Sequence, residues 1–326
     1  SPTFAQHRQW IQRQLAKAPP DWADRPEVLQ AIAGFYAEQG DEGFNAARDA
    51  YQRAVQLKDE YGHVAVKAIE QLANMEARHG KKLADKGQFD TANNLIDSAI
   101  RRLKSLADSV RGEGAPAGNT ERAAMLGSAY KIRAVALLKA EKEWSEVSLS
   151  LAEAARAYLS GVQGDPAQSP YNTLNALPLA WLADTLGQST EEAAALARQC
   201  GETARKLFAN SKSFWDAVMS VDAEMTAWLL GSPLDEPDSK TTPATANSPA
   251  LTLQKRYEQA VQSLPRSARE WDSVVKQWRL LAGFILKSPR KEEASELSNA
   301  LIKLADHFDP PSISDSTAGL PPTGEQ

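Results

Sequence analysis

Helical periodicity runs along almost the whole chain and limits the possible folds more than any other feature. In "QFDTANNLIDSAIRRLKSLADSV" (88–110), apolar residues recur every three or four positions while Asp, Asn and Arg occupy the other side. That apolar stripe consists of Phe89, Ala92, Leu95, Ile96, Ala99, Ile100, Leu103 and Leu106. Strict alternation of apolar and polar residues, which is typical of strands, is nearly absent. The sequence therefore predicts an all-α fold.

About thirteen helical segments follow from this pattern, separated by stretches rich in Pro, Gly, Ser and Asp. The predicted helices fall near 3–17, 26–39, 41–57, 60–84, 88–110, 119–142, 143–162, 169–187, 189–210, 212–231, 250–263, 266–287 and 289–308. Many helices with short connections can form either a compact bundle or a solenoid, and internal repeats distinguish the two.

Partial repeats favour a solenoid. The tetratricopeptide pattern places Leu-Gly-x-x-Tyr on the first helix of a hairpin and Ala-x-x-x-Phe/Tyr-x-x-Ala on the second, because small residues let two backbones approach closely. The first-helix pattern is complete in "AMLGSAYKIRA", at Leu126, Gly127 and Tyr130. The second-helix spacing occurs at Ala47, Tyr51 and Ala54, at Ala92, Ile96 and Ala99, and at Ala154 and Tyr158. We expect an α-solenoid of tetratricopeptide-like hairpins, with an irregular compact bundle as the alternative.

Composition excludes several classes of protein. The formal charge of −5 does not suit a surface that coats nucleic acid, and no apolar run is long enough to cross a membrane. The first residues contain neither a signal-peptide core nor an initiator methionine, so we interpret the sequence as a segment of a longer, cytoplasmic protein. A single cysteine, Cys200, excludes an intrachain disulfide framework, and four scattered histidines make a metal site unexpected.

Four segments resemble a known family. They are "EYGHVAVKAIEQLANMEAR" (60–78), "SPYNTLNALPLAWL" (169–182), "FWDAVMSVDAEMTAWLLG" (214–231) and "RSAREWDSVVKQWRLLAGFIL" (266–286). They look like the helical repeat region of bacterial multidomain proteins that carry a CHAT domain, a caspase-like protease. The "PYNTLNALPL" stretch is also similar to the repeat-containing regulatory region of apoptosis-signal-regulating kinases. The resemblance implies an accessory scaffold in a bacterial defence or signalling system. Because the caspase-like His and Cys strands are missing, it implies no protease activity.

These patterns predict four regions. We expect a tetratricopeptide-like array over 1–230, a flexible linker or long loop over 231–249, C-terminal hairpins that pack on the array over 250–308, and a disordered tail over 309–326.

No set of residues has the spacing of a catalytic centre. Cys200 lies on a predicted helix without a recognisable base and is expected to be a buried small residue. His63 and His79 lack metal-ligand spacing and are expected at the surface or at helix ends. The pair Asp41 and Glu42 fits a solvated helix N-terminus. Most of the tryptophans are expected to pack in the core, with one or two exposed.

A binding surface is expected on the first helices of the hairpins, which line the concave face of such a solenoid. Its polar candidates are Lys67, Glu70, Asn74, Arg78, Ser128 and Lys131. Mixed charge suits a protein or peptide partner, such as an adjacent effector domain of the parent chain, better than nucleic acid or membrane. We therefore predict a non-catalytic interaction and regulatory scaffold without a cofactor. The alternatives are a small-molecule or nucleotide sensor that switches a linked effector and, least favoured, an all-α enzyme.

Overall fold

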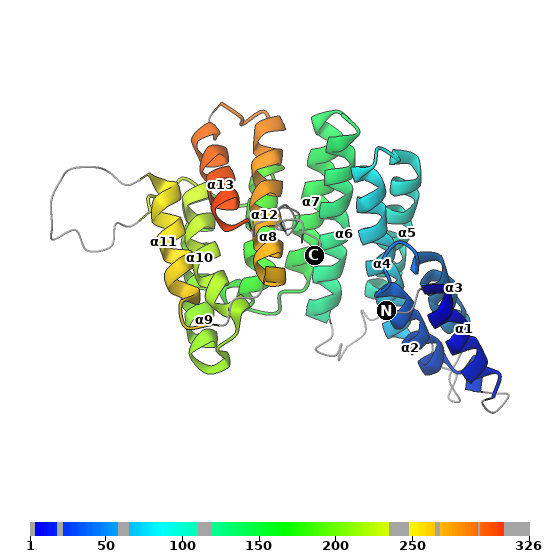
Figure 1. The fold of residues 1–326 in the computed structure, drawn as a ribbon. Coiled ribbons are helices and arrows are strands. Elements are labelled where there is room, and N and C mark those ends of the chain that lie inside the picture. Colours follow the sequence, from blue (N-terminus) through cyan, green and yellow to red (C-terminus); the bar gives the residue numbers. More distant parts are fainter. Residues whose placement is uncertain are drawn as a thin grey trace, which may run out of the picture. The chain divides into compact units, whose positions relative to one another are not determined.

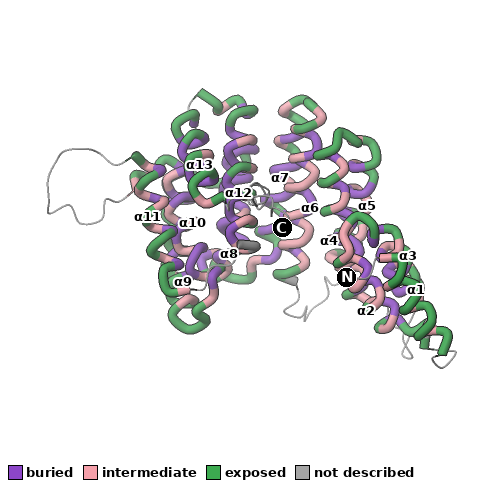
Figure 2. The backbone as a smooth tube through the Cα atoms, in the orientation of Figure 1, coloured by how far each residue is buried: buried purple, intermediate pink, exposed green. Residues whose placement is uncertain are grey.

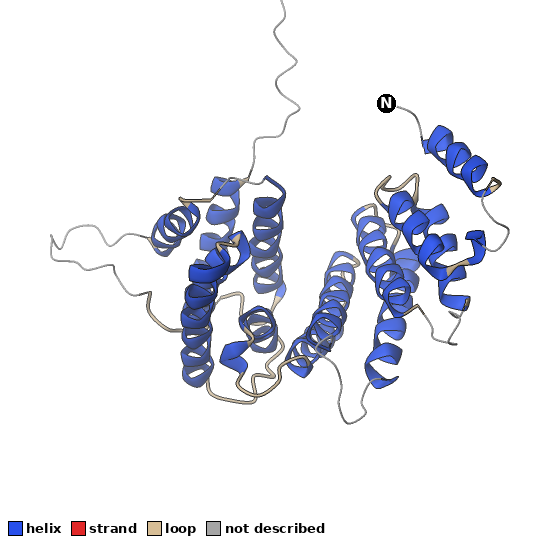
Figure 3. Cartoon of the chain, turned by 90° about the horizontal axis from the view of Figure 1, so that it is seen from below, coloured by secondary structure: helices blue, strands red, loops and turns tan. Residues whose placement is uncertain are grey.

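The computed structural model describes residues 4–17, 22–57, 65–109, 119–234, 248–264, 268–292 and 294–309. This part of the chain contains thirteen α-helices and two short 3-10 helices, and it contains no strand (Figures 1 and 3). All thirteen predicted helices are present, so the all-α prediction is confirmed. The chain folds into two compact units, residues 1–188 and 189–326.

Unit 1 carries the first eight helices. They are α1 (Phe4–Leu15), α2 (Pro26–Ala37), α3 (Phe44–Gln56), α4 (Val66–Asp85), α5 (Phe89–Ser109), α6 (Asn119–Lys139), α7 (Trp144–Ser160) and α8 (Pro170–Leu182). From α2 to α8 each helix packs against the next one in the chain, and α4 also packs against α2 and α6. This is the packing of stacked hairpins in which the first helices lie beside one another, as predicted for an α-solenoid.

Small and aromatic residues at the repeat positions explain the close packing of unit 1. Ala47, Ala54, Ala92 and Ala99 are completely buried, and Tyr158 is 1% exposed. Figure 2, which colours the backbone by burial, shows that buried residues recur along the helices of this unit. The repeat pattern therefore identifies core positions, as expected from the steric role of small residues.

Gly127 lies in α6 directly against the Tyr158 ring of α7. A Cβ atom built on Gly127 would be 2.5 Å from Cδ2 of Tyr158, closer than real Cβ contacts allow. Glycine normally destabilises a helix interior by about 1 kcal/mol relative to alanine. Here its missing side chain makes room for the Tyr158 ring, so this glycine is architectural.

Unit 2 contains the remaining helices, α9 (Thr190–Ser211), α10 (Phe214–Leu229), α11 (Pro249–Val261), α12 (Ala268–Lys287) and α13 (Ser295–Phe308). Ser189 begins α9 with a capping box: its side chain accepts from the Glu192 backbone N–H, and the Glu192 carboxylate accepts from the Ser189 backbone N–H. The core is aromatic. Tyr257 and Trp278 have ring centroids 4.8 Å apart, and Trp271 stacks on Phe308 at 4.4 Å.

The boundary between the two units falls after Gln188, whereas the sequence predicts the end of the array at residue 230. The difference arises because α9 and α10 form a hairpin, α10 packs on α11, and α11 packs on α13. Residues 190–229 thus belong with the C-terminal helices. The core of the predicted linker, 235–247, and the predicted tail from residue 310 onwards lie outside the described residues.

Candidate functional site

Helix α4 carries a polar stripe along one face. Lys67, Gln71, Asn74, Arg78 and Lys82 follow one another at spacings of three or four residues, which places them on the same side of the helix. The opposite side is buried and includes Ala68, Leu72, Ala73 and Ala77. The amphipathic pattern of α4 thus fixes which side chains face away from the core of unit 1.

A groove of about 310 Å³ lies between α4 and the hairpin of α2 and α3. Its apolar lining includes Phe44, Tyr51 and Met75, of which Phe44 and Tyr51 are buried. Its polar lining consists of Asp41, Gln71, Asn74, Arg78, His79 and Lys82. An apolar floor with a few polar and charged groups is the usual composition of a binding site.

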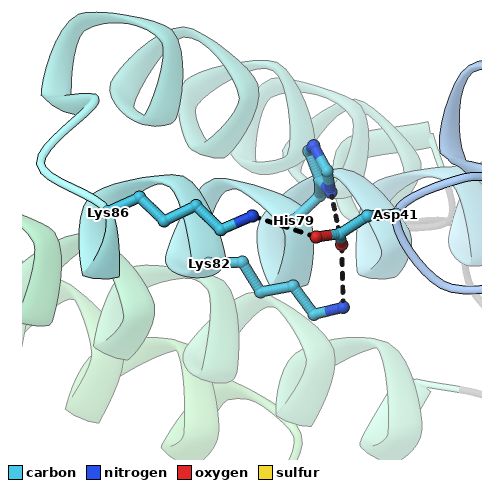
Figure 4. Close-up of polar contacts among 4 residues, drawn as sticks. All are labelled: Asp41, His79, Lys82 and Lys86. Carbon is cyan, nitrogen blue, oxygen red and sulfur yellow. Dashed lines mark hydrogen bonds and ion pairs between the residues drawn. The ribbon is translucent and has the colours of Figure 1, made fainter.

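Asp41 ties the turn before α3 to the last turns of α4 (Figure 4). Lys82 Nζ donates to Asp41 Oδ1 at 3.0 Å, and Lys86 Nζ donates to Asp41 Oδ2 at 3.1 Å. His79 Nδ1 lies 3.7 Å from Asp41 Oδ1. The hydrogen bonds from Lys82 and Lys86 lower the pKa of Asp41 to about 2, so its carboxylate is charged near neutral pH.

His79 forms one side of the groove. Its ring stacks on Phe44 with a centroid distance of 3.7 Å and an interplanar angle of 10°. Burial lowers the pKa of His79 below its ordinary value, against the opposing effect of Asp41. The imidazole is therefore a mainly neutral, flat surface in the groove near pH 7. The expectation of a surface or helix-end histidine is wrong for His79, since it lies inside α4 and its side chain is 17% exposed. His63 lies outside the described residues.

Two of the six predicted surface residues line this groove: Asn74 and Arg78. Lys67 and Glu70 lie nearer the beginning of α4, in an ion-pair network with α6. Arg122 Nε donates to Glu70 Oε1 at 2.7 Å, and Lys67 lies 3.4 Å from the other carboxylate oxygen. Glu70 is only 6% exposed. Glu70 therefore links α4 to α6 and is not exposed to a binding partner, although its place in the sequence suggests that it would be.

Ser128 and Lys131 lie elsewhere, on the side of α6 that meets α7 and α8. Lys131 Nζ donates to Asn175 Oδ1 at 3.3 Å and lies 5.8 Å from the centre of the Tyr158 ring. Burial lowers the pKa of Lys131 to about 8. A hydrogen bond links Ser128 to Tyr158. These two residues thus form part of a helix–helix contact, separate from the groove beside α4.

Asp41, His79, Lys82 and Lys86 were not predicted as site residues. Lys82 continues the four-residue spacing of Asn74 and Arg78 along α4, and this signal is present in the sequence. Asp41 could not be found in the same way because it comes from another hairpin. Asp41 is exposed just before α3, in agreement with the expected solvated position, and it also pairs with Lys82 of α4 and with Lys86, the residue that follows α4.

The remaining candidates have structural positions. Cys200 is completely buried in α9, as predicted. Trp181, Trp271 and Trp278 are buried, whereas Trp10, Trp22 and Trp215 are exposed, one more than the one or two expected. Within the described ranges, no group of three or more His, Cys, Asp or Glu side chains is placed to hold a metal ion. None of the helices described is both long enough and apolar enough to span a membrane.

Comparison with known proteins agrees with this architecture. A search of curated proteins finds no match. The family model of Tetratricopeptide Repeats-Sensor, TPR-S, matches residues 11–180, which is just over half of the 326 residues. The matched segment lies in unit 1 and contains every residue that lines the groove beside α4. The chain belongs to the TPR-S family.

Proposed function

We propose that this chain is a non-catalytic scaffold that binds an acidic segment of a protein partner in the groove beside α4. The observation that carries the proposal is the groove itself, which combines an apolar floor of Phe44, Tyr51 and Met75 with the cationic groups of Arg78 and Lys82. Tetratricopeptide-type arrays bind partners on the extended surfaces that their first helices form, and α4 is such a helix.

Charge supports an acidic partner. The whole chain carries a formal charge of −5, yet the groove and its edge bring together Arg78, Lys82 and Lys86 against one carboxylate, Asp41. The net negative charge of the chain attracts basic partners at long range. An acidic segment is therefore recognised only at short range, by the cationic side chains of the groove. Asn74 adds an amide that can donate to and accept from a peptide backbone. The groove thus offers charge, hydrogen bonds and apolar contact to one extended segment.

The partner that we propose is a caspase-like effector or its adjacent region in the parent protein. The support is the resemblance of residues 60–78, 169–182, 214–231 and 266–286 to repeat regions that accompany CHAT domains. In this proposal the scaffold holds the effector in place or restrains it, and the groove provides one of the contacts.

Peptide binding tests the proposal directly. Fluorescence anisotropy would compare three pools of labelled dodecapeptides, all of which contain Leu and Phe. The acidic pool also contains Asp and Glu, the neutral pool contains Asn and Gln, and the basic pool contains Lys and Arg. We expect the acidic pool to bind most tightly and the variant Arg78→Ala/Lys82→Ala to lose most of that binding. The control variant Arg101→Ala/Lys142→Ala removes the same charge from exposed positions outside the groove. Equal loss in both variants, or equal binding of the neutral pool, would contradict the proposal.

A small-molecule sensor is the second candidate. A groove of about 310 Å³ falls at the lower end of the roughly 300–1,000 Å³ usual for small-ligand pockets, and the family is described as a sensor. Thermal unfolding in the presence of a cell extract filtered below the size of peptides distinguishes the candidates. A rise in the unfolding temperature that Arg78→Ala abolishes would favour the sensor, whereas acidic-pool binding without such a rise favours the docking scaffold.

A further inference from the structure

The turn that connects α2 to α3 has a shape that only particular residues permit. Gly40 has a φ of +66°, in the left-handed region that side chains disfavour. A Cβ atom on Gly43 would be 1.9 Å from the Tyr36 carbonyl oxygen. The two glycines bracket Asp41 and Glu42. The turn is therefore held in a defined shape that brings the Asp41 carboxylate to α4.

The Asp41 carboxylate lies between two ammonium groups one helical turn apart. Lys82 lies in the last turn of α4 and Lys86, four residues later, directly follows the helix, so their like charges lie close together and repel. Each takes a different oxygen of the carboxylate, at 3.0 and 3.1 Å. The nearby carboxylate of Asp85 forms ion pairs with Lys81 and Lys139. A carboxylate on the Lys82–Lys86 pair thus relieves a repulsion, and any other carboxylate could bridge the two amines in the same way.

Because the three side chains are exposed, another carboxylate can take the place of Asp41 between the two lysines. The side chains of Asp41, Lys82 and Lys86 are 46%, 54% and 57% exposed, so water and solutes reach all three. Ion pairs at such exposure contribute little net free energy. Exchanging one carboxylate for another at this position therefore costs little, and the apolar floor of the groove is left to provide net affinity to an incoming segment.

We infer that Lys82 and Lys86 form an anion subsite at the edge of the groove, that Asp41 occupies it in the free protein, and that a carboxylate of the bound segment replaces Asp41. The inference rests on the proposed function and names its chemistry: the segment places an Asp or Glu side chain at the end of α4. Asp41 then acts as an internal competitor that weakens binding and excludes segments without a correctly placed acidic group.

Two variants of the same turn test the inference. Asp41→Asn removes the competing charge, and Glu42→Gln removes an equal charge from the neighbouring exposed residue. We expect Asp41→Asn to bind the acidic peptide pool roughly two- to tenfold more tightly, since the competing ion pairs are exposed and weak. Glu42→Gln should bind like the original protein. No gain in Asp41→Asn, or an equal gain in both variants, would overturn the inference.

A probe that does not depend on peptide recognition separates the subsite from the proposed function. Carbon-13 signals of the lysine ε-methylene groups would be followed in the full chain during titration with sodium acetate, against sodium chloride at the same ionic strength. In Asp41→Asn we expect acetate to shift the Lys82 and Lys86 signals more than chloride does, and more than in the original protein.

The outcomes have distinct meanings. Selective acetate shifts together with failure of every acidic peptide to bind would leave the subsite in place and reject the proposed function. Identical shifts with acetate and chloride in Asp41→Asn would overturn the subsite. The variant Lys82→Gln/Lys86→Gln should bind the acidic pool more weakly than the original protein, and unchanged binding would also overturn it.

Discussion

At the scale of single residues, Gly127 shows how a local cost is offset by packing. The Tyr158 ring from α7 occupies the volume that a side chain at Gly127 would need. Gly34 in α2 offers a comparison, because a Cβ atom there would meet only the Tyr51 hydroxyl at 3.8 Å, an ordinary contact. A side chain fits beside Gly34 but not beside Gly127, so substitution by alanine should affect the stability of the protein differently at the two positions.

We expect Gly127→Ala to lower the free energy of unfolding by about 1–3 kcal/mol, the usual effect of overpacking a tight contact. Gly34→Ala should change it by less than about 1 kcal/mol, toward greater stability, because alanine is the better helix former. Urea unfolding followed by circular dichroism measures both. Equal effects of the two substitutions would contradict the assignment of Gly127 to a close helix contact.

The charge state of Asp41 gives a second prediction at this scale. Because Lys82 and Lys86 lower the pKa of Asp41 from 3.8 to about 2, the folded state favours its charged form. The resulting stabilisation is present above pH 3.8 and is lost as the pH falls toward 2. Carbon-13 titration of the Asp41 carboxyl group should show a midpoint near 2. In Lys82→Ala/Lys86→Ala the midpoint should return toward 3.8, and an unchanged midpoint would show that the two lysines are not the cause.

The sequence could identify residues of the site only along a single helix. Asn74 and Arg78 follow from the periodicity of α4, and the structure places both in the groove. The partners of Glu70 and Lys131 come from α6 and α8, 52 and 44 residues further along the chain, so periodicity could not show that these residues are engaged in helix contacts. Asp41 was missed for the same reason, since Lys82 lies 41 residues away.

At the scale of helices, ion pairs to one buried carboxylate join neighbouring hairpins. Glu76 of α4 is completely buried and lies between Arg48 of α3, at 3.3 Å, and Arg102 of α5, at 3.1 Å. The side chains of Arg48 and Arg102 are 37% and 27% exposed, so without Glu76 both arginines would keep partial access to water. Glu76 therefore links three consecutive helices through one carboxylate.

We expect Glu76→Ala to lower the free energy of unfolding by about 1–3 kcal/mol, because it removes the charged contacts of two arginines that keep part of their exposure to water. Arg156→Ala, which removes an exposed partner of Glu153 on α7, should change it by less than about 1 kcal/mol. Urea unfolding midpoints compare the two. A small effect of Glu76→Ala would show that α3, α4 and α5 do not depend on this contact.

The contact between α10 and α11 is expected to depend on pH. The Tyr257 hydroxyl donates to Asp222 Oδ1 at 2.5 Å, and burial raises the pKa of Asp222 from 3.8 to about 6. Between these pH values the folded state binds more protons than the unfolded state, so stability falls as the pH rises from about 4 to 6. Unfolding free energies at about pH 4 and about pH 7 should therefore differ less in Asp222→Asn than in the original chain. Carbon-13 titration of the Asp222 carboxyl should give a midpoint near 6, and a midpoint below about 4 would contradict the burial argument.

At the scale of the whole molecule, the sequence predicted the helices better than their grouping. Capping residues and proline at the first helical turn are local signals, so α8, α9 and α11 begin close to where they were predicted. The division after Gln188 depends on which helices pack together. The apolar pattern of a single helix does not identify its packing partners. The TPR-S match ends at residue 180, close to the end of α8 and within unit 1.

Recognition of an acidic segment by specific side chains of the groove beside α4 underlies the function proposed for this molecule. It is tested by the affinity of the full chain for the acidic peptide pool in Arg78→Ala/Lys82→Ala and in Arg101→Ala/Lys142→Ala, at two salt concentrations. We expect only the groove variant to lose binding, at both salt concentrations. Equal losses in the two variants, both disappearing at high salt, would show that the groove is not the binding site.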